Sequence, residues 1–378
     1  MTTRLLVGVD AGNCNFDIAV ARPSHLKEIE YATILAVMVA TDRRFVHHKY
    51  PFVQINDGQK FLTGQHAVET GGMFIDDHQK EFWWDGQTVH PLWLHLLFRG
   101  VINTLPALNV LSRDIELVLN VAIPFDEYIL DERGVFAKGV SFFDTISKAP
   151  YKIVTEQGTF VIRIAPFGKF LPQPEFCIYS SMHRVDDSNT LETDESWLFH
   201  KNGTPKFIRV YDGGGGTVGC MTYSISELSG LFLATEVAVA KQRVGFWESV
   251  IPAFREALIE RYGREIETLT QWQIEKSFTS RQYNGHDVKS LRDGIVKQYA
   301  GIYTALWREN IRNLPLISLA PFYGRQLMVL QPYFEASLHA LAEENDITLI
   351  FPKPEEHGKH AAKGALYGAA NDNLRNER

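Results

Sequence analysis

The sequence contains the same short pattern twice. Residues 4–9 form a β-branched apolar run that ends at Asp10 and a turn, and an extended pattern resumes at residues 15–20. Far along the chain, residues 207–211 lead into Asp212 and four glycines, and residues 217–224 form the returning strand. A strand, an aspartate turn and a second strand thus occur twice, about two hundred residues apart, and this internal repeat is the most informative feature of the sequence.

The composition of the two turns suits a phosphate. Glycine lets the backbone approach an anion closely and present N–H groups to it, and the polar side chains of Asn15 and Thr217 add donors. Through these turns we expect a nucleotide to contact Asp10, Gly12, Asn13, Cys14, Asn15, Asp212, Gly213, Gly214, Gly215, Gly216 and Thr217.

The two carboxylates require a cation in this interpretation. Asp10 and Asp212 would repel a bare phosphate, so their position beside the turns predicts a hard divalent ion, most simply Mg²⁺ held through water. Taken alone, a turn like the first is more often an ordinary hairpin, and an aspartate followed by glycines is a flexible loop at least as often as a phosphate-binding turn. The matching contexts favour nucleotide binding, and neither the Walker loop nor the dinucleotide fingerprint is present.

The remaining pattern alternates helices and strands, which predicts an α/β fold. An antiparallel meander with a hairpin at residues 56–58 is followed by a buried helix over 90–107 and a strand over 115–123. A polar stretch over 183–202 lacks periodicity and indicates a surface excursion. Further helices are predicted over 175–183, 245–261, 288–311, 334–344 and 358–373.

Composition and charge narrow the classes of function. The 378 residues are 45% hydrophobic and 22% charged, which indicates a globular chain of about two domains. The net charge of −7 opposes direct contact with nucleic acid, so any DNA is expected to be reached through an adaptor protein. Three scattered cysteines and the lack of a long apolar run predict a cytoplasmic protein that does not contact membranes.

On these residues the chain resembles the actin, sugar kinase and heat-shock ATPase superfamily, whose two phosphate hairpins look like residues 10–15 and 212–217. Within it, the chain is most similar to the ParM/StbA type of actin-like protein that segregates plasmids. The other segments that carry the resemblance are 117–124, the pair Pro172-Gln173, residues 244–246 before a long helix, and residues 361–364.

The resemblance implies an actin-like two-lobe α/β fold, each lobe a mixed β-sheet flanked by helices, with ATP or GTP and Mg²⁺ in a cleft between the lobes. Lobe I is expected over 1–180, completed by a C-terminal helix over 360–378. The polar excursion over 181–205 would form the crossing, and lobe II would follow over 206–359.

The resemblance also implies roles for single residues. Asp10 would organise metal-bound water and Asp212 the metal itself, while Gln173 would orient the attacking water; these three are the predicted catalytic residues. Gly245 and Gly324 would add nucleotide contacts. Glu175 is the second candidate for the water-orienting role, although a carboxylate in the first turn of a helix has a structural use as well.

The sequence departs from the family at the adenosine end, where residues 319–325 retain only Gly324 of the usual glycine pair. Phe322 or Tyr323 could stack on a base or pack in the core, and Lys241 and Arg243 could reach phosphate or lie on the surface. The choice between ATP and GTP therefore stays open. The histidines at 47, 48, 357 and 360 have no metal-ligand spacing. The aromatic group 82–84 is either a subunit contact or buried under a loop, and Cys14 in the first turn is either an activated thiol or a packed side chain.

Three functions are compatible with these residues. The first is an actin-like NTPase that polymerises head to tail into dynamic filaments and acts in plasmid or DNA segregation through an adaptor. The second is a non-polymerising small-molecule kinase of the same superfamily. Such a kinase needs a catalytic carboxylate positioned at the acceptor hydroxyl, and no segment of the sequence indicates one. The third is a nucleotide-binding scaffold of low turnover.

Overall fold

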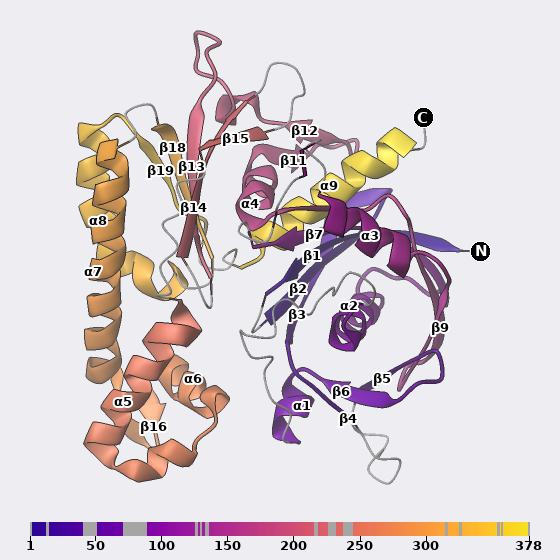
Figure 1. Cartoon of the computed structure of the whole chain (residues 1–378), viewed down its shortest axis with the longest axis horizontal. Helices are drawn as coiled ribbons and strands as arrows, with labels where there is room; N and C mark the ends of the chain where they lie inside the picture. Colours follow the sequence, from indigo (N-terminus) through magenta and orange to yellow (C-terminus); the bar gives the residue numbers. More distant parts are fainter. Residues whose placement is uncertain are drawn as a thin grey trace. The chain divides into compact units, whose positions relative to one another are not determined.

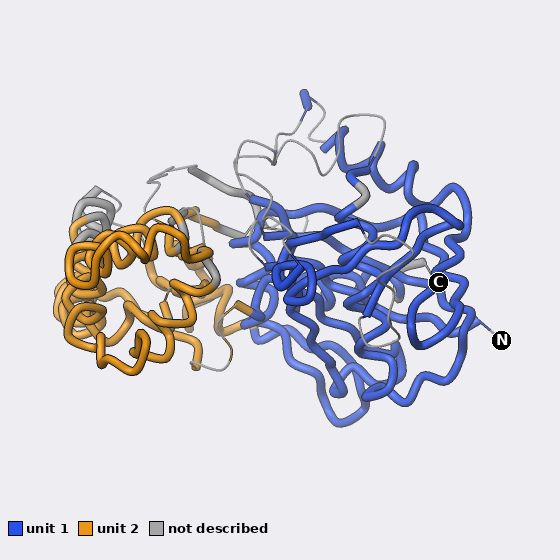
Figure 2. The backbone as a smooth tube through the Cα atoms, turned by 90° about the horizontal axis from the view of Figure 1, so that it is seen from below, with its two compact units in different colours: residues 1–194, 359–378 blue, residues 195–358 orange. Residues whose placement is uncertain are grey.

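The chain forms two compact units in a computed structural model of the protein. Unit 1 contains residues 1–194 and 359–378, and unit 2 contains residues 195–358 (Figure 2). The chain passes between them inside the predicted polar excursion, after residue 194. The structure describes residues 2–12, 15–40, 51–70, 89–124, 128, 131–132, 136–214, 218–225, 232–236, 245–313, 317–324, 327–353, 356 and 358–376.

Unit 1 is built on a ten-stranded mixed sheet. In order across the sheet, nine of the strands are β3 (His25–Leu35), β2 (Asn15–Arg22), β1 (Thr3–Ala11), β7 (Asp114–Ile123), β9 (Gly158–Ile164), β8 (Tyr151–Thr155), β5 (Phe52–Ile55), β6 (Lys60–Thr63) and β4 (Met38–Ala40). The tenth strand, β10 (Lys169–Pro172), pairs in parallel with the end of β7. The three strands β1, β2 and β3 form the predicted antiparallel meander, and β7 runs parallel to β1.

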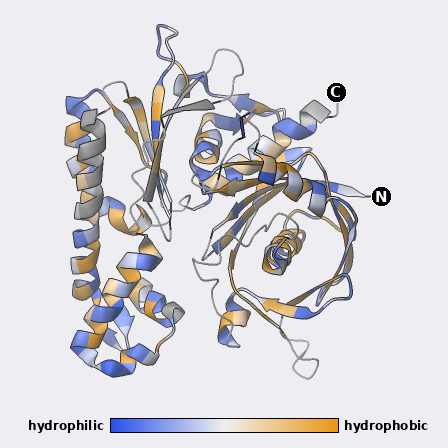
Figure 3. Cartoon of the chain, in the orientation of Figure 1, coloured by the Kyte–Doolittle hydropathy of each residue, from blue (hydrophilic) through white to orange (hydrophobic). Residues whose placement is uncertain are grey.

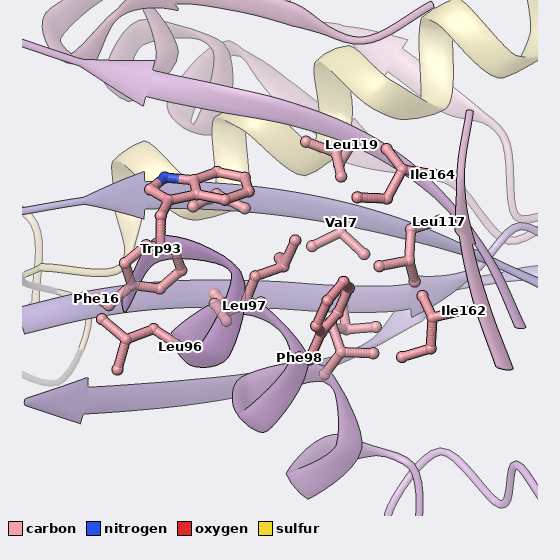
Figure 4. Close-up of a cluster of buried hydrophobic side chains, with 14 of the residues drawn as sticks. Val7, Phe16, Trp93, Leu96, Leu97, Phe98, Leu117, Leu119, Ile162 and Ile164 are labelled. Atoms are coloured by element: carbon pink, nitrogen blue, oxygen red, sulfur yellow. The ribbon is translucent and has the colours of Figure 1, made fainter. Parts of the chain in front are cut away.

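The sheet of unit 1 curls around helix α2 (Pro91–Thr104) (Figure 1). The helix begins where predicted, because Pro91 fits the first helical position and the side chain of His90 accepts a hydrogen bond from the backbone N–H of Leu92. Most residues of α2 are themselves apolar (Figure 3). Its side chains meet those of the sheet in one buried core (Figure 4), where the rings of Trp93 and Phe16 pack edge to face at 5.7 Å.

The opposite face of the sheet carries helices α4 (Gln173–Met182) and α9 (His360–Asn376). Alternate residues of β1 point to this face: Leu6 joins the core under α9, and the next residue on the same side, Gly8, lies against the backbone of α9. Gly364 lies equally close to the backbone of Phe176 in α4. Small residues therefore bring one strand and two helices into direct backbone contact.

Unit 2 has a five-stranded sheet in the order β15 (Phe232–Glu236), β14 (Val218–Ile225), β13 (Phe207–Gly213), β18 (Ile317–Tyr323) and β19 (Thr348–Ile350). As in unit 1, an antiparallel hairpin is extended by a parallel strand, since β13 pairs with β14 antiparallel and with β18 in parallel. The helices that follow β15 are α5 (Ile251–Tyr262), α6 (Gln271–Ser280), α7 (Lys289–Asn313) and α8 (Leu327–Glu344).

The structure differs from the predicted elements at several points. The polar stretch contains a short hairpin of β11 (His183–Val185) and β12 (Leu191–Thr193). In the described part of the chain, the helices α1 (Gln65–Glu69), α3 (Ala137–Ile146) and α6 lie where none was predicted. The helix predicted to start at residue 245 begins with a π-helical turn, Phe246–Val250. Among the described residues, no helix is both long and apolar enough to cross a bilayer.

Candidate functional site

The first predicted turn follows strand β1 in unit 1. Asp10 lies on the face that carries α4 and α9, because it continues the alternation of Leu6 and Gly8. Gly12 lies close to the returning strand, since a Cβ at this position would lie 2.8 Å from the carbonyl oxygen of Asn15 and the turn would have to shift to accommodate it. The predicted contacts Asn13 and Cys14 lie outside the described residues.

Gln173 reaches the first turn from a separate segment. Strand β10 pairs with the end of β7, and Gln173 follows it as the first residue of α4. Its side-chain Nε2 donates a hydrogen bond of 2.5 Å to Oδ1 of Asp10. Because a carboxylate only accepts hydrogen bonds, this contact fixes which end of the amide faces Asp10. The amide oxygen Oε1 is thereby directed away from Asp10, where it can accept a hydrogen bond from water.

Glu175 lies two residues further along α4 but does not share this position. Glu175 is only 7% exposed, and this burial raises the pKa of its carboxyl group to about 8. The pKa of Tyr128 rises to about 12, first because of its own burial and second because of the charge of Glu175. A largely protonated carboxyl is a poor base, so the geometry favours Gln173 over Glu175 for orienting water.

The second predicted turn follows strand β13 in unit 2. Asp212 lies in register with Gly219 of β14 and with Tyr323 of β18. Burial raises the pKa of its carboxyl to about 7. A carboxylate that has lost its water gains from a bound cation, and its hard oxygen atoms suit Mg²⁺. Gly215, Gly216 and Thr217 lie outside the described residues.

Two other predicted contacts meet the second turn within unit 2. Gly324 has a φ of +105°, and a Cβ there would overlap the backbone of Gly213. The backbone N–H of Phe246, which follows Gly245, donates to the carbonyl oxygen of Gly214 at 3.4 Å. Three glycine-containing segments that are distant in sequence therefore converge at the end of β13, and one of them opens a π-helical turn, a feature frequent at functional sites.

The aromatic residues near Gly324 belong to the core. Phe322 is 2% exposed and its ring stacks on Tyr211, with centroids 4.7 Å apart, and on Phe351 at 4.8 Å. Tyr323 is 1% exposed. Stacking of either ring on a nucleotide base, one of the two alternatives from the sequence, is therefore not supported. Lys241 and Arg243 lie outside the described residues, as do the histidines 47, 48 and 357 and the aromatic group 82–84.

The histidine at 360 and both described cysteines are buried and have contacts within the protein. His360 is 8% exposed, and its Nδ1 lies 2.6 Å from the Ser180 hydroxyl. Cys177 and Cys220 are buried, and the Cys220 sulfur accepts a hydrogen bond from Arg209. Within the described ranges, no group of three or more histidines, cysteines or acidic residues is arranged to hold a metal ion.

Sequence reasoning overlooked Asp17, which the structure brings directly opposite Asp10 on the neighbouring strand. The signal was available, because a hairpin whose turn is centred on residues 13–14 pairs residue 10 with residue 17. Thr33 extends the same row on β3.

Comparison with known proteins identifies the fold. No family model matches the sequence, and no curated protein matches it. Among solved structures, Bacillus thuringiensis ParM with ATP is 15% identical and matches with a TM-score of 0.64 over 99% of this chain and 100% of that one. The archaeal actin homolog Ta0583 is 14% identical and matches with a TM-score of 0.69 over 98% of this chain and 100% of that one. The chain has an actin-like, ParM-type fold.

This result confirms the predicted fold class. A further match of similar quality is a non-polymerisable quadruple mutant of pCBH ParM, at 14% identity and a TM-score of 0.64 over 98% of this chain and 99% of that one. Because all three identities are low, the similarity extends to the fold alone.

Proposed function

We propose that this actin-like protein is an NTPase that binds ATP or GTP with Mg²⁺ through both aspartate turns and polymerises head to tail. The observation that carries the proposal is the equivalence of the two turns. Asp10 is the penultimate residue of β1 and lies in register with Ala122 of the parallel strand β7. Asp212 is the penultimate residue of β13 and lies in register with Tyr323 of the parallel strand β18. Similar folds have been solved with ATP and with AMPPNP, which supports a nucleotide as the ligand.

The roles of the residues follow from their contacts. Backbone N–H groups of the turns would bind the phosphates, with Gly245 and Gly324 supporting the second turn. Asp10 and Asp212 would hold Mg²⁺, through water, and the ion would neutralise charge on the phosphates. Asp10 also holds the Gln173 amide, whose oxygen would orient a water for attack on the terminal phosphate. Since an amide positions water without accepting its proton, we expect slow hydrolysis to diphosphate and inorganic phosphate.

Self-association and a role in segregation complete the proposal. A head-to-tail contact that does not close generates a filament, and a matching ParM described as a non-polymerisable mutant supports polymerisation in proteins of this fold. We propose that the filament acts in the cytoplasm and moves plasmid or other DNA through a DNA-binding adaptor protein. The net charge of −7 supports an adaptor over direct contact with DNA.

Light scattering and electron microscopy test the proposal directly. The purified protein is mixed with ATP or GTP, with and without Mg²⁺, and phosphate release is followed in the same samples. We expect nucleotide-dependent filaments whose formation precedes phosphate release. In Asp212→Ala, hydrolysis should be lost; retained hydrolysis would contradict the assigned site. Phosphate transfer to a small-molecule hydroxyl without scattering would support a kinase, and binding without turnover would support a scaffold.

A further inference from the structure

The first turn carries a second carboxylate that the proposed function does not use. Asp17 lies on β2 directly opposite Asp10 on β1. Directly opposed residues of an antiparallel pair have their side chains on the same face, with their Cβ atoms about 5 Å apart. The face that presents Asp10 at the end of the strand therefore presents two carboxylates.

The surroundings of Asp17 hold it in place. The residue is 8% exposed, and its Oδ1 accepts a hydrogen bond of 2.5 Å from the hydroxyl of Thr33, its in-register neighbour on β3. On the other side of the pair, the in-register neighbour of Asp10 is the uncharged Ala122. Asp10 is oriented separately, by Gln173. Each carboxyl group thus accepts a hydrogen bond from a donor of its own, and the two residues lie side by side on one face of the sheet.

We propose that Asp17 makes nucleotide binding conditional on a divalent cation, an inference that rests on the proposed nucleotide site. Asp17 adds a second negative charge beside the phosphate turn and so repels a metal-free triphosphate. The repulsion weakens when a divalent cation cancels part of the phosphate charge. Asp17 is then a specificity residue that discriminates the metal-chelated nucleotide from the free one, without itself being a metal ligand.

The charge of Asp17 can be separated from its hydrogen bond. In Asp17→Asn the amide oxygen still accepts from Thr33, but the charge is gone. In Thr33→Val the hydroxyl is gone, but the charge remains. Asp17→Glu keeps the charge, and Asp17→Ser is a second neutral variant. The exposed Asp187, in the β11–β12 turn, provides Asp187→Asn as a control that changes the net charge of the protein by the same amount.

The experiment measures the Kd of a fluorescent ATP analogue, and of the GTP analogue, in excess Mg²⁺ and in EDTA. The quantity compared is the ratio of the two Kd values. Removing one charge a few ångströms from the phosphates should tighten metal-free binding by roughly tenfold and lower the ratio by that factor. We expect this in Asp17→Asn and Asp17→Ser, whereas Asp17→Glu, Thr33→Val and Asp187→Asn should keep the wild-type ratio. Circular dichroism melting checks that each variant is folded.

Failure of this inference is distinguishable from failure of the proposed function. If the wild type binds in Mg²⁺ and the neutral variants keep its ratio, the role of Asp17 is wrong and the nucleotide site stands. If Thr33→Val lowers the ratio as Asp17→Asn does, Asp17 acts through the hydrogen bond and the charge argument is wrong. If the wild type binds neither analogue under either condition, both proposals are contradicted.

Discussion

The two aspartate turns are alike in topology and different in construction. The turn of unit 1 is organised by side chains: Gln173 donates to Asp10, and Thr33 donates to Asp17. The turn of unit 2 is organised by backbone: Gly324 lies against Gly213, and the N–H of Phe246 reaches the carbonyl of the next residue, 214. If both turns bind the nucleotide as proposed, the difference predicts a division of labour, in which unit 1 orients the reacting groups and unit 2 shapes the phosphate-binding backbone.

Gly324→Ala should break the backbone construction of unit 2. A Cβ at residue 324 overlaps the backbone of Gly213, and a φ of +105° is unfavourable for alanine. We expect the free energy of unfolding of unit 2 to fall by more than about 3 kcal/mol, with loss of nucleotide binding. Urea unfolding and nucleotide titration measure both effects.

Gly294→Ala is the matched control for this prediction. Gly294 lies in α7 with no atom within 4 Å of its added Cβ. An alanine in an unhindered helical position should raise stability by about 0.5–1 kcal/mol. Equal behaviour of the two variants would show that the close approach at Gly324 is unimportant.

Glu175→Gln tests how the buried carboxyl group near Gln173 makes the stability of unit 1 depend on pH. Since the folded-state pKa is raised from 4.5 to about 8, the native state holds a proton that the unfolded state releases between these values. The contribution of Glu175 to the free energy of unfolding is therefore greatest below about pH 4.5 and is lost as the pH rises through about 8. Between about pH 5 and pH 7.5 this contribution falls by roughly 3 kcal/mol. Glutamine does not titrate, so the free energy of unfolding of the variant, measured in urea across this range, should fall less than that of the wild type. Parallel pH curves for the two proteins would refute the assignment.

Gln173→Ala should separate chemistry from binding. The Gln173 amide is held by Asp10, so its removal should lower kcat by about 100-fold, or about 2.7 kcal/mol of transition-state stabilisation, while nucleotide Kd stays within a factor of about three. Single-turnover phosphate release and equilibrium titration measure the two quantities. Gln157→Ala, in the exposed β8–β9 turn, serves as the control. A loss of affinity equal to the loss of rate would assign Gln173 to binding instead.

The parts of the fold that the sequence predicts correctly are those set by local turn residues. The two Asp–Gly turns and the Asn56–Gly58 hairpin form between the strands expected, because turn residues and alternating apolar residues act over short distances. The β11–β12 hairpin was not predicted because its strands are only three residues long and carry no hydrophobic alternation. Helix α8 extends beyond the predicted range 334–344 at its N-terminal end, where it includes Pro332, a residue that usually interrupts a helix.

The candidate site was predictable only where its residues share a turn. Asp10 and Asp212 stand beside their glycines in the sequence. The contact between Gln173 and Asp10 depends on β10 pairing with β7, and the approach of Gly324 to Gly213 depends on β18 pairing with β13. Such pairings are set by tertiary packing, which local patterns do not encode. The resemblance to actin-like proteins supplied Gln173 and Gly324, and the functional roles of all these residues stay predictions.

Gly12→Ala provides the smallest effect and the sharpest test of the contrast between the turns. Among the described residues, its Cβ would approach the backbone carbonyl of Asn15, with the oxygen at 2.8 Å, whereas the Cβ at Gly324 would overlap three backbone atoms of Gly213. In addition, Gly12 is not among the glycines with positive φ, so alanine can adopt its conformation. A small shift of the turn should relieve the contact at a cost of about 1 kcal/mol, with less than tenfold loss of nucleotide affinity. The same urea and titration measurements apply, with Gly324→Ala as the comparison. If Gly12→Ala is as damaging as Gly324→Ala, the first turn depends on its backbone as much as the second, and the proposed division of labour fails.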